Sequence, residues 1–143
     1  MRINAKLESK DKICVITSGH LIRQKTFFDI MDWITIKDED QIQDIFKATD
    51  YSIIYKHSPR CMTSLMAYRQ LKSEVSNAKQ VEIPLYIVDV ISNRRESQLI
   101  AGTFLIQHES PQILVIKNGV CVFNTSHENV SLQAVMEHIN QAA

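Results

Sequence analysis

The stretch Tyr51-Ser-Ile-Ile-Tyr-Lys-His-Ser-Pro-Arg-Cys-Met-Thr-Ser64 decides the fold, because a strand-like run in it turns directly into a helix. Residues 51–56 are rich in β-branched and aromatic side chains, which is typical of a buried strand. After the turn, apolar side chains recur every three or four positions and predict a helix that ends near residue 78. Cys61 therefore lies where the strand gives way to the start of the helix.

The rest of the chain continues this alternation of strands and helices. The pattern predicts strands at 33–36, 84–90, 112–117 and 120–125, and helices at 39–48, 94–101 and 130–139. Lys37-Asp38 is expected to cap the first of these helices, and Gly102 to end the second. Asn118-Gly119 separates the last two strands and predicts an antiparallel hairpin.

Composition narrows the class of protein. A chain of 143 residues with 45% hydrophobic residues predicts one folded domain, which we place at 31–143, after an N-terminal extension of uncertain structure at 1–30. The formal net charge of zero argues against a nucleic-acid partner, and no apolar run approaches the length of a membrane span. We therefore expect a cytoplasmic protein with no nucleic-acid or membrane partner.

The cysteine count points to the same compartment. The chain has three cysteines, Cys14, Cys61 and Cys121, an odd number without metal-type spacing or a disulfide framework. Free thiols of this kind fit a reducing cytosol. We expect neither a bound metal nor a cofactor.

The surroundings of Cys61 favour a reactive thiol. The start of a helix offers unpaired backbone N–H groups and the positive end of the helix dipole, both of which favour the thiolate. His57 and Arg60 add positive charge nearby, and Ser64 can present its hydroxyl to the sulfur. Ser64 also occupies the place of a second cysteine three residues on, so an intramolecular disulfide cannot form there. The remaining chemistry is thiol–disulfide exchange through a mixed disulfide.

Ser110-Pro111 immediately precedes the strand at 112–117 and supplies a second landmark. A cis proline facing the thiol would present backbone groups to a bound disulfide. The element order β-α-β-α-β-α-β-β-α, with a thiol at a helix start and a proline opening a later strand, predicts a thioredoxin-like α/β fold. Its mixed central sheet would carry helices on both faces. The ordinary alternatives are an inert small cysteine and a trans proline that merely opens a strand.

These residues resemble the monothiol bacilliredoxins, thioredoxin-like proteins of the bacillithiol system. The resemblance covers roughly residues 33–140, and it is carried by three short segments: Lys56-His57-Ser58, His108-Glu109-Ser110-Pro111-Gln112 and, more weakly, Ser126-His127. The family typically shows Thr-Cys-Pro-Ile-Ser at its site, where this chain has Arg60-Cys61-Met62-Thr63-Ser64. The cysteine and the final serine are retained, while the other three positions differ.

The resemblance implies a thiol–disulfide oxidoreductase. Cys61 would be the catalytic nucleophile that removes a low-molecular-weight thiol, bacillithiol by analogy, from S-thiolated proteins. Ser110 and Pro111 would line the substrate-binding groove, and the small thiol would act as co-substrate. A second hypothesis is a non-catalytic thioredoxin-like interaction or stress-response module that uses the same groove. A third is a redox sensor in which Cys61 pairs with Cys14.

Overall fold

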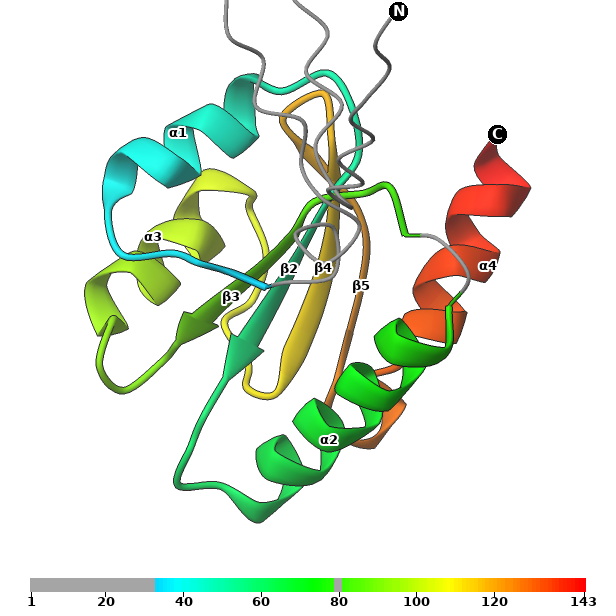
Figure 1. Ribbon diagram of the computed structural model, residues 1–143. Helices are drawn as coiled ribbons and strands as arrows, with labels where there is room; N and C mark the ends of the chain where they lie inside the picture. The colour runs from blue at the N-terminus through cyan, green and yellow to red at the C-terminus, as the bar shows by residue number, and fades with distance from the viewer. Residues whose placement is uncertain (1–32, 79–80) are drawn as a thin grey trace, which may run out of the picture.

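A computed structural model describes residues 33–78 and 81–143, which form a single mixed sheet with helices on both faces (Figure 1). The sheet has the order β1-β3-β2-β4-β5. Its strands are β1 (Ile34–Thr35), β2 (Ser52–His57), β3 (Leu85–Asp89), β4 (Gln112–Lys117) and β5 (Val120–Ser126). β1, β3 and β2 are parallel, whereas β4 is antiparallel to β2 and β5 is antiparallel to β4. The expected thioredoxin-like arrangement is confirmed.

The helices divide between the two faces of the sheet (Figure 1). They are α1 (Glu39–Lys47), α2 (Met62–Asn77), α3 (Arg94–Thr103) and α4 (Leu132–Ala142), with a short 3₁₀ turn, η2 (His127–Asn129), before α4. α1 and α3 cover one face, and α2 and α4 cover the other. Alternate residues of the central strands feed the two cores: Ile53 and Tyr55 pack under α2, and Ile54 packs under α1 and α3.

Side-chain hydrogen bonds fix where α1 and α4 begin. Asp38 accepts a hydrogen bond from the Gln41 backbone N–H at 3.0 Å, which confirms the predicted cap of α1. The start of α4 is held from α2, because a Glu74 carboxylate oxygen accepts from the backbone N–H of Leu132 at 2.6 Å. The second Glu74 oxygen lies 3.2 Å from the Ser131 hydroxyl. These bonds lock α2 and α4 together on the face that carries Cys61.

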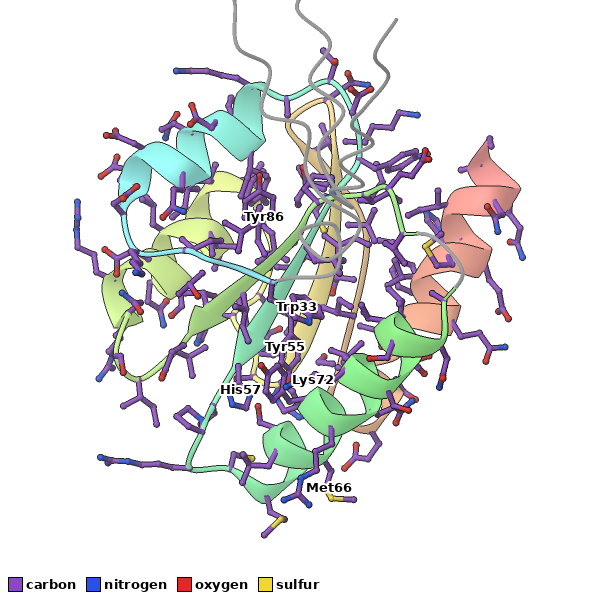
Figure 2. All side chains as sticks on the ribbon, in the orientation of Figure 1. Trp33, Tyr55, His57, Met66, Lys72 and Tyr86 are labelled. Atoms are coloured by element: carbon purple, nitrogen blue, oxygen red, sulfur yellow. The ribbon has the colours of Figure 1, made fainter. Side chains whose placement is uncertain are left out.

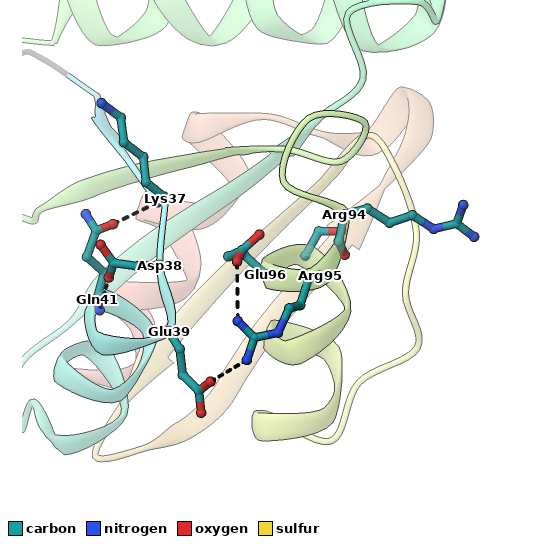
Figure 3. A network of polar contacts seen from close by, with 8 residues as sticks. Lys37, Asp38, Glu39, Gln41, Arg94, Arg95 and Glu96 are labelled. Atoms are coloured by element: carbon teal, nitrogen blue, oxygen red, sulfur yellow. Dashed lines mark hydrogen bonds and ion pairs between the residues drawn. The ribbon is translucent and has the colours of Figure 1, made fainter.

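On the opposite face of the sheet, a surface ion pair joins α1 and α3 (Figure 3). Arg95 of α3 lies 2.9 Å from a Glu39 carboxylate oxygen of α1 and 3.9 Å from one of Glu96. The Arg95 side chain is 74% exposed, so the contribution to stability is small. The two helices are held mainly by their shared core, which includes Ile42, Ile45 and Ile100.

The predicted boundaries agree with the structure to within two residues, except that the last helix was expected to end at 139 and α4 ends at Ala142. The end of α3 also differs in its cause. Gly102 was expected to stop this helix, but it lies inside the last turn and Phe104 is the C-cap. Leu105 adopts the left-handed conformation with φ 53°, and the Ile106 N–H bonds the Ala101 carbonyl at 3.0 Å. This is a Schellman motif with a leucine at the left-handed position, where glycine is usual. The sequence pattern therefore places the helix end too early, at the glycine. The hairpin is as predicted, with Asn118 and Gly119 both at positive φ.

Candidate active site

Cys61 is the N-cap residue of α2, as the sequence predicts. Its carbonyl accepts from the Leu65 N–H at 3.0 Å, while its own N–H donates to the Ser58 carbonyl at 3.2 Å and closes the turn after β2. The residue is half-buried, and its side chain makes no capping hydrogen bond. The first turn of α2 contains no acidic residue, and Arg60 is exposed beside the cysteine. The helix start therefore presents a free thiol with no carboxylate in that turn to oppose its charge.

Ser64 holds the strand and the helix together beneath this turn. It is fully buried, and its Oγ accepts from the Ser58 backbone N–H at 2.8 Å. The same oxygen lies 3.0 Å from Nδ1 of His57 and 3.2 Å from the Tyr55 hydroxyl. Tyr55 in turn donates to the Ser64 carbonyl at 2.9 Å. The predicted neighbours His57 and Ser64 are thus brought together, and Ser64 has several partners other than the sulfur.

Aromatic rings pack beside this hydrogen-bond network, and Figure 2 labels two of them, Tyr55 and His57. The Tyr55 ring stacks nearly parallel to that of Tyr68, with centroids 6.2 Å apart, and the His57 ring lies 4.9 Å from Tyr68. Burial raises the pKa of Tyr55 to about 12, opposed by its bond to Ser64 and reinforced by the nearby Cys61. The phenol therefore stays protonated and remains a hydrogen-bond donor.

His57 supplies less positive charge than the sequence suggested. Burial lowers the pKa of His57, with Asp89 on the neighbouring strand acting in the opposite direction. An imidazole whose pKa lies below its usual value is mostly neutral at pH 7. Asp89 itself accepts from the backbone N–H groups of Ile91 and Ser92 and so caps the turn after β3. Arg60 is therefore the permanent charge among the predicted thiolate-stabilising residues.

The Ser110–Pro111 peptide bond is cis. Register pairs Lys56 with Gln112, so the start of β4 lies beside the end of β2, at the same sheet end as the Cys61 turn. The Pro111 carbonyl accepts from the His127 N–H at 2.9 Å, which ties this loop to η2. The Ser110 Oγ is buried and has no hydrogen-bond partner among the described residues.

The segments that carry the family resemblance meet in space around this loop. Lys56 Nζ lies 3.1 Å from Nδ1 of His108, and the Ser126 hydroxyl donates to the Glu109 carboxylate. The Gln112 side chain donates to the Gln107 carbonyl at 3.0 Å. Three segments far apart in the sequence therefore form one hydrogen-bonded frame for Ser110 and Pro111.

Lys56 is the residue that sequence reasoning missed. It is fully buried in β2, and burial lowers its pKa to about 8. Burial also lowers the pKa of its partner His108, and the positive charge of Lys56 acts in the same direction. A lysine inside an otherwise apolar strand could have marked this position as unusual. The contact itself could not be predicted, because its partner lies 52 positions away in the sequence.

The sequence also raises the question of the two remaining cysteines and of a metal site. Cys121 is half-buried in β5, and burial raises the pKa of its thiol. Cys14 and the predicted extension at 1–30 lie outside the described residues. Within 33–78 and 81–143, no group of three or more His, Cys, Asp or Glu side chains is placed to hold a metal ion.

Comparison with known proteins now decides the family. Residues 34–135 match the family model described as monothiol bacilliredoxin BrxC. The chain belongs to the monothiol bacilliredoxin family. A solved structure described as a proposed oxidoreductase with a thioredoxin fold is 26% identical with a TM-score of 0.64, and the match covers 74% of this chain and 92% of the other. For this bacilliredoxin, family and fold together give a thiol–disulfide redox role and thiol-related partners.

More distant structures show the fold alone. Thioredoxin from Malassezia sympodialis is 15% identical with a TM-score of 0.60, and the match covers 87% of this chain and 97% of the other. Thioredoxin from Trypanosoma brucei brucei is 10% identical with a TM-score of 0.62, covering 79% and 92%. No helix in the described part of the bacilliredoxin has both the length and the apolar character needed to cross a membrane.

Proposed function

We propose that this bacilliredoxin removes a low-molecular-weight thiol from protein mixed disulfides through Cys61. The observation that carries the proposal is the half-buried thiol at the N-cap of α2, in a helix whose first turn has no acidic residue. The Cys61 thiolate attacks the sulfur of the small thiol, a new S–S bond forms, and the protein thiolate leaves. A second thiol then releases the small thiol from Cys61. Membership of the bacilliredoxin family supports bacillithiol as the proposed small thiol.

Each residue of the candidate site has a proposed role in this exchange. Arg60 stabilises the thiolate by its charge, while His57 and Ser64 fix the turn and the helix start against β2. Ser110 and Pro111 line the groove that receives the mixed disulfide. The small thiol is a co-substrate, neither a cofactor nor a metal takes part, and the reaction belongs to the reducing cytoplasm.

Alkylation kinetics test whether Cys61 is the reactive thiol. The reduced chain is treated with iodoacetamide at pH 7, and peptide mass spectrometry follows each cysteine separately. We expect Cys61 to be labelled at least about tenfold faster than Cys121, whose thiol is kept protonated by burial. Denatured protein serves as the control, because all three cysteines should then react alike. Equal rates for Cys61 and Cys121 in the folded chain would contradict the proposal.

One observation favours a second function, a non-catalytic interaction module. Met62 and Met66 are 70% and 57% exposed on the first two turns of α2, next to Cys61. Flexible methionines at a surface suit adaptable protein binding (Figure 2 labels Met66). Under this alternative, capture of a partner survives Cys61→Ser and is lost in Met66→Asp. The proposed oxidoreductase function instead requires the Cys61 thiol and is lost in Cys61→Ser.

A further inference from the structure

A groove of about 360 Å³ lies between α2 and η2. Thr63, Met66 and Arg69 line it from α2, and His127, Glu128 and Val130 line it from the other side. This volume falls at the lower end of the range for small-molecule sites, which is about 300–1,000 Å³. The groove is therefore sized for a small ligand.

The groove adjoins the candidate active site at both of its walls. Thr63 is the second residue of α2, directly after the Cys61 turn. On the other wall, the backbone N–H of His127 is bonded to the carbonyl of Pro111. The groove therefore adjoins the Cys61 turn along α2 and the Pro111 loop through η2.

The two walls carry opposite charges. Arg69 on α2 and Glu128 in η2 are both exposed at the groove, and no ion pair within the described part of the chain uses either side chain. Met66 supplies apolar surface beside them, whereas Val130, which also lines the groove, is buried. A guanidinium binds a carboxylate, and a carboxylate binds an ammonium group, by charge-assisted hydrogen bonds. The groove is therefore complementary to a ligand that carries both charges.

We propose that this groove binds the non-sulfur part of a zwitterionic low-molecular-weight thiol, with Arg69 on its carboxylate and Glu128 on its ammonium group. The inference rests on the proposed function, because the ligand reaches the groove as one half of a disulfide attacked by Cys61. The thiolate of Cys61 forms a bond to the sulfur of that half. The original S–S bond breaks, and the other half leaves with the electron pair as a thiolate. The disulfide itself is the oxidant.

Four symmetrical disulfides of different charge test the groove. Glutathione disulfide carries both charges, dithiodipropionate only carboxylates, cystamine only ammonium groups, and hydroxyethyl disulfide none. The rate of adduct formation on Cys61 is measured by intact mass for the wild type, Arg69→Gln and Glu128→Gln. Loss of one charged hydrogen bond should slow the matching reaction roughly tenfold. Arg69→Gln should slow the first two disulfides, and Glu128→Gln should slow glutathione disulfide and cystamine.

The matched control is Lys72→Gln, which removes a charge from the same helix one turn further on, outside the groove. It should leave the ranking of the four disulfides unchanged, and hydroxyethyl disulfide should react alike with every variant. The inference is overturned if Arg69→Gln slows all four disulfides equally, or if Lys72→Gln has the same effect as Arg69→Gln. A wild type whose Cys61 fails to react with hydroxyethyl disulfide would instead overturn the proposed function, and the inference with it.

Discussion

Lys56 places an amine in a fully buried position of β2, directly before the residues that hold the Cys61 turn. Its Nζ contacts Nδ1 of His108 at 3.1 Å, so the strand is fixed to the loop that leads to Pro111. Among the described residues, no carboxylate forms an ion pair with Lys56. The amine therefore holds the loop by a hydrogen bond, at the cost of burying a charge that has no ionic partner in the described part.

This cost makes stability depend on pH. Because the folded chain lowers the pKa of Lys56 from 10.5 to about 8, the unfolded chain binds more protons between these values, and stability rises with pH across that window. The free energy of unfolding of the wild type relative to Lys56→Met should therefore increase by up to about 3 kcal/mol from pH 8 to pH 10.5. Urea unfolding at several pH values measures this difference.

The comparison with Lys56→Met is needed because other groups titrate in the same range. Burial raises the pKa of Cys121 and of Tyr55, and both shifts lower stability as the pH rises through their ordinary values. The control variant is Lys47→Met, which removes an exposed charge from α1. If the free energy of unfolding of the wild type relative to Lys56→Met stays constant from pH 8 to pH 10.5, the proposed cost of burying the Lys56 charge is contradicted.

Single residues were predictable from sequence only where the signal was local. Cys61 could be placed at a helix start because the strand, turn and helix pattern lies within fourteen consecutive residues, Tyr51–Ser64. The partners of Ser64 could not be predicted, because a serine three residues after a cysteine suggests a hydroxyl that faces the sulfur. The Lys56–His108 contact joins residues that no local pattern relates.

The junction of β2 and α2 is the element on which the candidate site depends. Ser64 connects the two elements through Ser58 and His57, and Tyr55 reaches the Ser64 carbonyl from the strand. The strand end, the turn and the first turn of the helix are thus tied to one buried hydroxyl. These hydrogen bonds fix the position of Cys61, because the cysteine lies in the turn between the strand end and the helix start that they join.

Removal of the Ser64 hydroxyl should therefore loosen the junction. In Ser64→Ala the half-buried Ser58 N–H loses the buried hydroxyl that accepts from it, so the free energy of unfolding should fall by about 1–3 kcal/mol. Chemical unfolding measures this loss. The control is Ser76→Ala on the same helix, whose hydroxyl bonds the Lys72 carbonyl at the exposed surface and should change stability by less than about 0.5 kcal/mol.

The same variant also tests the predicted role of Ser64 toward the thiolate. A hydroxyl that stabilises the sulfur directly would make iodoacetamide labelling of Cys61 slower in Ser64→Ala under fully native conditions. A hydroxyl that acts only through the junction would leave that rate unchanged while stability falls. Stability equal to that of the wild type would contradict the structural role proposed for this residue.

Helix ends show where element prediction succeeds and fails. Asp38 and the Asn118-Gly119 turn are short, local signals, and both were predicted correctly. The end of α3 was placed at Gly102 because glycine favours the left-handed conformation, but Leu105 adopts it instead. Ile100 and Phe104 are buried in the core with α1, and this packing extends the helix past the glycine.

At the scale of the whole molecule, the sheet separates a structural face from a reactive one. α1 and α3 cover one face of the sheet, and α2 and α4 cover the other (Figure 1). Cys61 begins α2, and the groove lies between α2 and η2. The crossover from β2 to β4 brings Ser110 and Pro111 to the same sheet end as the cysteine. The order of elements predicted this arrangement, because a parallel pair followed by an antiparallel strand allows few topologies.

The most direct test of the central claim is the transfer of a small thiol from a protein to Cys61. A model protein carrying one bacillithiol or glutathione mixed disulfide is mixed with the reduced bacilliredoxin, and intact and peptide mass spectrometry follow both chains. We expect the model protein to lose the small thiol while this chain gains one adduct, on Cys61. Cys61→Ser should show no transfer. The proposed redox role of Cys61 is contradicted if the wild type leaves the mixed disulfide intact, or if the adduct forms equally on Cys61→Ser.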